Sequence, residues 1–268
     1  MPNFVTIPAP ATSGAPKRVV WHHKLSWVAD VRVTPAQREH LRLVNAWLYE
    51  HDHEQLPVVP HRERSVKIFG NEKVLDKLMV TSLFGEGRLT LELVRARRVA
   101  PRFTFETVGP GDLLLVVENS DTFDSLVSAL TRNPGQVGLV GWGAGGGFEQ
   151  SVLSVPRLGR AVREVRYFGD LDVKGLQIPA NADLVAAGEN LPRVRPAAGL
   201  YEAMFRHARA QACQTPASAT TAAALAGWLP EPLRRPAGAH LMGGTRLAQE
   251  EVGITELGAG ESWRADLR

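Results

Sequence analysis

Three carboxylates follow apolar segments, and their types and spacing suit the binding of a divalent cation. Asp170 and Asp172 come just after the run VRYF, one residue apart, so in an extended chain both side chains point the same way. Glu118 follows a second apolar run, LLLVV. Carboxylates held together raise one another's pKa, and a divalent cation relieves their repulsion. Hard oxygen ligands with room left for water suit Mg²⁺, with Mn²⁺ as an alternative, better than zinc.

The acidic pair has a second interpretation, which the pattern alone leaves open. Asp is common in turns, so Asp170 and Asp172 also fit a solvated turn that holds no ligand. Gly169 and Gly175 favour a ligand site, because glycine allows a tight turn and a close approach of the backbone. The loop GWGAGGG at 141–147 could turn backbone N–H groups toward a phosphate. It has neither the GK[ST] of a Walker A loop nor the spacing of a dinucleotide fingerprint.

The apolar runs before these residues predict a parallel sheet that would position them. Residues 111–130 read as a buried strand, a polar turn and a helix, and the runs QVGLVGW and REVRYF begin similar units. Apolar strands separated by helical segments are typical of a parallel sheet covered on both faces. Side chains that do chemistry collect beyond the carboxyl ends of such strands. We therefore expect Glu118 to meet the Asp pair if their strands are neighbours, and we expect later helices over 215–229 and 243–254.

The first hundred residues predict a different unit. Residues 34–50 read as a helix in which Thr34 and Gln37 form a capping box. Residues 65–79 read as a short strand, a glycine turn and a helix, and 89–96 alternates like a strand. This order fits a small winged-helix-like α+β domain. The predicted domains are a flexible tail over 1–20, the winged-helix-like domain over 21–105 and an α/β domain with C-terminal helices over 106–268.

Charge and composition bound the classes of partner. The net charge of +3 and the pI of about 9.2 permit a polyanionic partner. Two clusters fit either phosphate contact or a solvated face: Arg95, Arg97, Arg98 and Arg102, and then Arg157, Arg160, Arg163 and Arg166. The single cysteine, Cys213, allows no disulfide framework. We find no apolar run that could cross a membrane and no secretory signal, and therefore expect a cytoplasmic protein without a membrane partner.

Together, these motifs resemble a known family. A strand-end glutamate followed later by D-x-D and glycine, here Glu118, Asp170-Leu171-Asp172 and Gly175, is similar to the signature of Toprim domains in topoisomerases, primases and related nucleases. The segments VVENSDTFDSL, YFGDLDVKGLQI, RSVKIFGNEKVLDKL and TRLAQEEV resemble the JetD family, the nuclease subunits of Wadjet plasmid-defence systems. The resemblance extends over roughly residues 60–255 and implies a Toprim-type parallel sheet, flanked by helices, after a winged-helix-like domain.

The resemblance also implies an activity and partners. It implies a Mg²⁺-dependent DNA endonuclease, working as a homodimer with an SMC-kleisin-type motor complex. Asp170 and Asp172 would hold the metal and Glu118 would act as general acid and base. Weaker candidates for DNA contact are Arg95, Arg97, Arg98 and Lys174, and the candidate accessory residues near the acids are Gln249 and Glu250. For Gln249 and Glu250, a capped or salt-bridged pair on a surface helix is the favoured alternative.

Two other functions remain in competition. The chain could be a non-catalytic DNA-binding or assembly subunit of an SMC-type complex. A topoisomerase, ranked last, would need a tyrosine nucleophile in the N-terminal domain. The sequence has Tyr49, Tyr167 and Tyr201, of which only Tyr49 precedes the predicted sheet. We therefore expect hydrolysis rather than a covalent tyrosyl intermediate.

Overall fold

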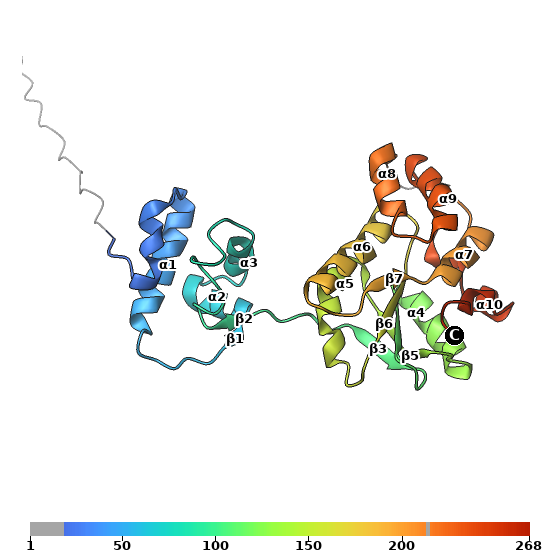
Figure 1. Ribbon diagram of the computed structural model, residues 1–268, viewed down its shortest axis with the longest axis horizontal. Helices are drawn as coiled ribbons and strands as arrows, with labels where there is room; N and C mark the ends of the chain where they lie inside the picture. The colour runs from blue at the N-terminus through green and yellow to red at the C-terminus, as the bar shows by residue number, and fades with distance from the viewer. Residues whose placement is uncertain (1–18, 213–214) are drawn as a thin grey trace, which may run out of the picture. The chain divides into compact units, whose positions relative to one another are not determined.

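The computed structural model describes residues 19–212 and 215–268 and divides into two compact units (Figure 1). One unit ends at Val99, and the other runs from Ala100 to Arg268. The division therefore falls earlier in the chain than the predicted boundary after residue 105. Of the predicted N-terminal tail, residues 1–18 lie outside the described residues, and so does Cys213.

The N-terminal unit is mainly helical. Its elements are a 3₁₀ helix at His23–Asp30, α1 at Pro35–Glu50, β1 at Val59–Pro60, α2 at His61–Phe69, α3 at Val74–Met79 and β2 at Ala96–Arg97. The predicted capping box of α1 is confirmed, because Gln37 N–H donates to Thr34 Oγ1 and Thr34 N–H donates to the Gln37 side chain. Buried Leu41, Val44 and Leu48 make α1 part of this unit's core.

Two predicted strands in this unit are wrong. Residues 65–69 form the end of α2, which Gly70 terminates in the left-handed conformation at φ 69°. Leu89 forms only an isolated bridge to Phe84, residues 91–95 form turns, and Ala96 enters the two-residue strand β2, which pairs in parallel with β1. A winged-helix arrangement of this unit stays a prediction.

The second unit is built on a five-stranded sheet, which confirms the predicted α/β class. Its strands are β3 at Thr104–Thr107, β4 at Leu113–Val117, β5 at Val137–Trp142, β6 at Glu164–Phe168 and β7 at Val194–Pro196. The strand order is β3-β5-β4-β6-β7, and only the edge strand β3 runs antiparallel to its neighbour. The strands that precede Glu118 and Asp170 are therefore neighbours in the middle of the sheet.

Helices cover both faces of this sheet. They are α4 at Ser120–Arg132, α5 at Phe148–Ser151, α6 at Val173–Gly188, α7 at Ala198–His207, α8 at Ala219–Ala226, α9 at Glu231–Met242 and α10 at Ile254–Gly258. Figure 1 shows α5 and α6 on one side of the sheet and α4 and α10 on the other. No helix among the described residues is long and apolar enough to span a bilayer.

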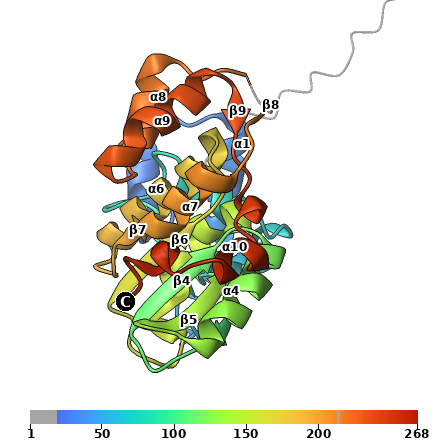
Figure 2. The same ribbon diagram turned by 90° about the vertical axis from the view of Figure 1, so that its right-hand side faces the viewer.

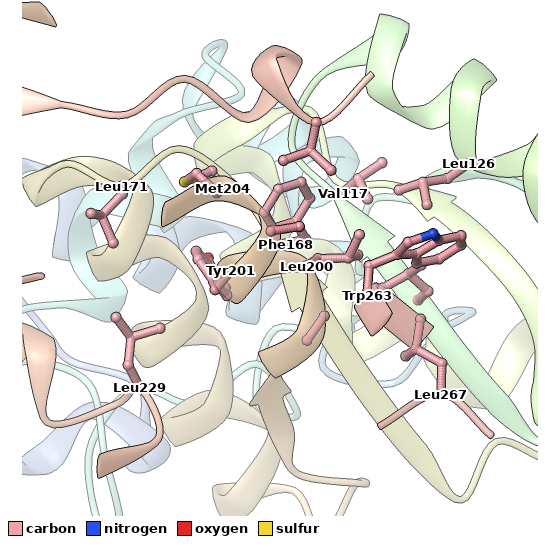
Figure 3. Packing of buried hydrophobic residues seen from close by; sticks show 14 of the residues in the cluster. Val117, Leu126, Phe168, Leu171, Leu200, Tyr201, Met204, Leu229, Trp263 and Leu267 are labelled. Atoms are coloured by element: carbon pink, nitrogen blue, oxygen red, sulfur yellow. The ribbon is translucent and has the colours of Figure 1, made fainter. Parts of the chain in front are cut away.

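Side chains of β4 alternate between two cores, as the two-residue period of a strand requires. Leu115 and Val117 belong to the larger core with α4 and α7, and Leu114 and Val116 belong to the core with α5 and α6. In the larger core, Phe168 at the end of β6 packs edge-to-face on Tyr201, with ring centroids 5.2 Å apart (Figure 3). This packing fixes the strand ends from which the acidic residues emerge.

The C-terminal region holds one further correction. Residues 243–254, predicted as a helix, form β9 at Thr245–Arg246 and a 3₁₀ helix at Gln249–Glu251. β9 pairs in antiparallel fashion with β8 at Gln211–Ala212 (Figure 2). After β9 the chain forms an antiparallel bridge to the D-x-D segment, between Leu247 and Leu171. A part of the chain expected to be an independent surface helix therefore lies against the acidic residues.

Candidate metal centre

The strand register brings Glu118 and Asp170 together. Val117 pairs with Phe168 at the end of the β4–β6 ladder, and Glu118 N–H donates to Phe168 O at 3.1 Å. Asp170 N–H then donates to Glu118 Oε2 at 3.3 Å. Of the expected meeting of Glu118 with both aspartates, the contact with Asp170 is present at the carboxyl ends of neighbouring strands, whereas no hydrogen bond joins Asp172 to either acid in the described part of the chain.

Each acid in this group has one oxygen held by a backbone N–H. Glu118 Oε2 accepts from Asp170 N–H, Asp170 Oδ1 from Gln249 N–H at 2.9 Å, and Asp172 Oδ1 from Gly175 N–H at 2.7 Å. Within the described residues, no hydrogen bond to the other oxygen of any of the three acids is present, and only Asp170 Oδ2 has an ion pair. Backbone anchoring thus orients all three carboxylates; it leaves the second oxygens of Glu118 and Asp172 without a described partner, whereas Arg246 Nη1 lies 3.4 Å from that of Asp170.

The three acids do not form a closed metal cage. Over residues 19–212 and 215–268, no three His, Cys, Asp or Glu side chains stand close enough to hold one ion together. Mg²⁺ does not need such a cage, because it usually keeps several waters and takes one or two carboxylates plus substrate phosphates. The donor set of hard, partly buried oxygens fits Mg²⁺ or Mn²⁺ in that mode, with Asp170 and Asp172 as the candidate ligands.

Burial and mutual repulsion disfavour the ionised forms of the carboxyl groups at the strand ends. Burial, and next the neighbouring Asp170 carboxylate, raise the pKa of Glu118 from 4.5 to about 7. Burial also raises the pKa of Asp170, although the hydrogen bond from Gln249 N–H and the charge of Arg246 act in the opposite direction. The side chain of Asp170 is only 12% exposed. A cation at the unanchored oxygens would remove the cost of ionising these groups.

Two buried tyrosines lie beneath the acids. Tyr167 and Tyr201 are both fully buried, and Tyr201 Oη accepts a hydrogen bond from Gly169 N–H at 3.2 Å. Burial raises the pKa of both phenols, so both stay neutral. Tyr201 on α7 therefore holds the turn that aims Asp170, a role that the sequence did not indicate.

Both glycines predicted to permit a close approach do so. A Cβ on Gly169 would stand 2.6 Å from Glu118 Oε2 and 2.8 Å from the Tyr167 ring. A Cβ on Gly175 would stand 2.2 Å from the carbonyl oxygen of Asp170. Real contacts of this kind are never so short, so neither position accepts a larger residue without moving a candidate ligand.

Gly175→Ala is expected to destabilise the protein by about 1–3 kcal/mol, because the new methyl group meets backbone that cannot rotate away. Gly188→Ala, at the other end of α6, is the matched control, since a Cβ there meets no atom within 4 Å. The control should be neutral or slightly stabilising. Urea denaturation of both variants measures the difference, and equal free energies of unfolding would contradict it.

The glycine-rich loop borders the same site. Ala144 and Gly145 both adopt the left-handed conformation, at φ 52° and 62°, as the loop leaves β5. Trp142 Nε1 at the start of the loop donates to the backbone carbonyl of Glu118 at 2.9 Å. An open depression of about 430 Å³ is lined by Glu118, Asn119, Ser120, Asp121, Trp142, Ala144, Gly145 and Glu250. The depression gives a large ligand access to Glu118.

The predicted accessory residues lie at the site, although not on a helix of the expected kind. The side chain of Gln249 is fully buried, and neither its Oε1 nor its Nε2 has a hydrogen-bond partner within the described part of the chain. Glu250 Oε1 accepts from Asn119 Nδ2 at 2.6 Å. Asn119 occupies the N-cap position of α4, but its side chain bonds Glu250 instead of capping the helix. Lys174 is exposed in the first turn of α6.

The predicted arginine clusters divide into different roles. Arg97 and Arg98 are exposed, and Arg95 Nε donates to the carbonyl of Leu56; all three belong to the N-terminal unit. In the second cluster, Arg160 donates to the carbonyls of Gly109, Pro110 and Gly111. Arg163 pairs with Asp112, and Arg166 pairs with Glu164 and Asp266. Arg160 and Arg163 therefore fix the loop that leads into β4, and Arg166 on β6 bonds the carbonyl of Pro196 on β7. Phosphate contact by this cluster stays a prediction.

Fold and site define an α/β protein with carboxylates gathered at the carboxyl edge of a mostly parallel sheet. Residues 90–257 match the family model described as Wadjet protein JetD, C-terminal. The match spans more than half of the 268 residues, and the chain belongs to this family. This membership places it in Wadjet defence systems and implies that it works with partners in a defence complex. Searches of curated proteins and of solved structures find no match.

Proposed function

We propose that this chain is a divalent-metal-dependent DNA endonuclease of a Wadjet system, with a Toprim-type catalytic centre. The observation that carries the proposal is the set of three acids, each oriented by a backbone N–H and each with a second oxygen that no described group hydrogen-bonds. These acids sit where functional residues of parallel sheets collect. Membership of the JetD family supports a role in defence against plasmids.

The three acids divide into two roles. Asp170 and Asp172 would hold the metal, while Gln249 N–H and Gly175 N–H fix their Oδ1 atoms. A bound Mg²⁺ would stabilise charge on the scissile phosphate and lower the pKa of water. Glu118 accepts or returns a proton at Oε1, since Oε2 already accepts from Asp170 N–H. In the metal-free protein, burial and the Asp170 charge raise the pKa of Glu118 to about 7, so this carboxyl can take up and release a proton near neutral pH.

Burial of the tyrosines supports hydrolysis over a covalent tyrosyl intermediate. Tyr167 and Tyr201 are fully buried, so neither phenol can reach a DNA phosphate without opening the core. Tyr49 is half exposed on α1, where it lies edge-on against His22 with ring centroids 5.0 Å apart. Within the described residues, no base hydrogen-bonds Tyr49 to activate it as a nucleophile. A topoisomerase therefore remains the weakest of the alternatives.

The proposal includes partners of defined chemistry. A homodimer would present one acidic centre to each DNA strand, and an SMC-kleisin-type motor would deliver the DNA. The exposed Arg97, Arg98 and Lys174 are the candidate phosphate contacts. Replacing the acids distinguishes a nuclease from a purely DNA-binding subunit, because only a DNA-binding subunit would still protect against plasmids. Charge reversal at Arg97 and Arg98 would impair plasmid protection in either case.

The test is cleavage of circular plasmid DNA by the purified chain together with its Wadjet partners. We expect nicked or linear product with Mg²⁺ or Mn²⁺ and none with EDTA, because the unneutralised acids would repel the phosphate. DNA ends free of covalently bound protein are expected. Cleavage that persists in EDTA, or product that carries bound protein, would overturn the proposal.

A further inference from the structure

The segment 245–250, which we call the C-terminal latch, contacts the candidate metal centre through both backbone and side chains. Leu171 N–H donates to Leu247 O at 2.9 Å, and Leu247 N–H donates to Leu171 O at 3.3 Å. Gln249 N–H holds Asp170 Oδ1, and Glu250 is bonded to Asn119. The latch therefore connects the ends of β4 and β6 and reaches both of the segments that carry the acids.

Arg246 of the latch holds the oxygen of Asp170 that does not bond Gln249. Its Nη1 lies 3.4 Å from Asp170 Oδ2, longer than the 2.7–2.9 Å of a strong charge-assisted hydrogen bond. The Arg246 side chain is 36% exposed, whereas the Asp170 side chain is 12% exposed. The carboxylate is thus fixed while its cationic partner is loosely held at the solvent side, an arrangement that favours exchange of the cation.

We propose that the guanidinium of Arg246 neutralises Asp170 in the metal-free protein, and that a divalent ion must displace it from Asp170 Oδ2 in order to bind. This inference rests on the proposed function, which assigns Asp170 as a metal ligand. Two cations at one carboxylate oxygen repel each other, so the ion and the guanidinium compete for Oδ2. The anchored Oδ1 keeps Asp170 in place during the exchange. Arg246 thereby weakens metal binding, and its released guanidinium becomes available to a DNA phosphate.

The test measures Mn²⁺ binding alone, without DNA, by the loss of the free-ion EPR signal. Arg246→Gln removes the competing charge and should lower the Kd for Mn²⁺ about tenfold, equivalent to ~1.4 kcal/mol. Arg246→Lys keeps a cation and should stay within about threefold of wild type. Arg132→Gln is the matched control: it removes the same charge from the last turn of α4, about 20 Å along that helix from the site. It should leave the Kd unchanged.

The possible failures are distinguishable. An unchanged or higher Kd for Arg246→Gln, with a normal circular dichroism spectrum, would show that Arg246 only supports the latch, and this inference would be wrong. If Arg246→Gln does not fold, Arg246→Met, which keeps an unbranched stem without the charge, takes its place, and the same two outcomes decide. Mn²⁺ binding that is absent in wild type, or unaffected by Asp170→Asn, would overturn the proposed function itself.

Discussion

Asp172→Asn is expected to reduce metal-dependent DNA cleavage by at least about 10³-fold while leaving the fold intact. The loss follows because a metal-stabilised phosphate transition state is worth several kcal/mol, and the neutral amide is a poor ligand for Mg²⁺. The fold is retained because Asp172 is also the N-cap of α6, where its Oδ1 accepts from Gly175 N–H. Asn caps a helix as well as Asp does. Plasmid cleavage and thermal unfolding measure the two effects.

Two further variants separate the roles of this residue. Asp172→Ala removes both the charge and the cap, and should lower the free energy of unfolding by about 0.5–2 kcal/mol in addition to abolishing cleavage. Ser218→Ala removes the cap of α8, where Ser218 Oγ accepts from Thr221 N–H at 3.1 Å, and should cost a similar amount of stability without loss of cleavage. Full cleavage by Asp172→Asn would remove Asp172 from the metal site.

The positions of the acids could be predicted because the apolar runs before them indicate which strands lie side by side in the sheet. The apolar runs before Glu118 and Asp170 each form a strand in which all or most residues are buried. Such runs enter the middle of a parallel sheet, and the residues that follow them emerge at one edge. The apolar composition of these runs thus indicates strands that are buried on both faces of the sheet. The carboxylates lie at the sheet edge because they directly follow such strands.

The latch and its arginine could not be predicted in the same way. The segment 243–254, predicted as a helix, is short, and the spacing of its apolar residues fits a helix as well as a strand. Pairing decides the outcome: Arg246 pairs with Gln211, and Leu247 bridges Leu171, and both partners are distant in sequence. The same reason explains the error at 89–96, where alternation is present but only Ala96 finds a neighbouring strand. The stretch 65–69 was misassigned because its helix begins earlier, at His61.

Glu118→Gln is expected to lower cleavage by about 10²–10⁴-fold, the range typical for loss of a general acid or base. The amide oxygen can still accept the hydrogen bond from Asp170 N–H, so the variant removes the proton-transfer capacity and the charge without removing the anchor. Glu202→Gln removes the same charge from an exposed residue on α7 that has no described bond to the three acids, and it should cleave as wild type does. Equal loss in both variants would argue against a catalytic role for Glu118.

The same variant should increase stability by an amount that depends on pH. The folded pKa of Glu118, about 7, lies above the ordinary 4.5, so the folded state favours the protonated carboxyl. Its contribution to stability is fully present below pH 4.5 and is lost as the pH rises through 7. In EDTA at pH 8, Glu118→Gln should therefore be more stable than wild type, by at most about 3 kcal/mol for a difference of 7 − 4.5 = 2.5 pKa units.

Below pH 4.5 this advantage should disappear, because wild type then carries the proton that makes its side chain as neutral as the amide. Added Mn²⁺ at pH 8 should also reduce the stability advantage of the variant, because the cation then neutralises the carboxylates of wild type in place of a proton. Urea denaturation at both pH values, with and without the ion, measures all three differences. A stability gain that is independent of pH would mean that the introduced amide side chain simply packs better, and that the strand-end carboxylates do not repel one another in the folded protein.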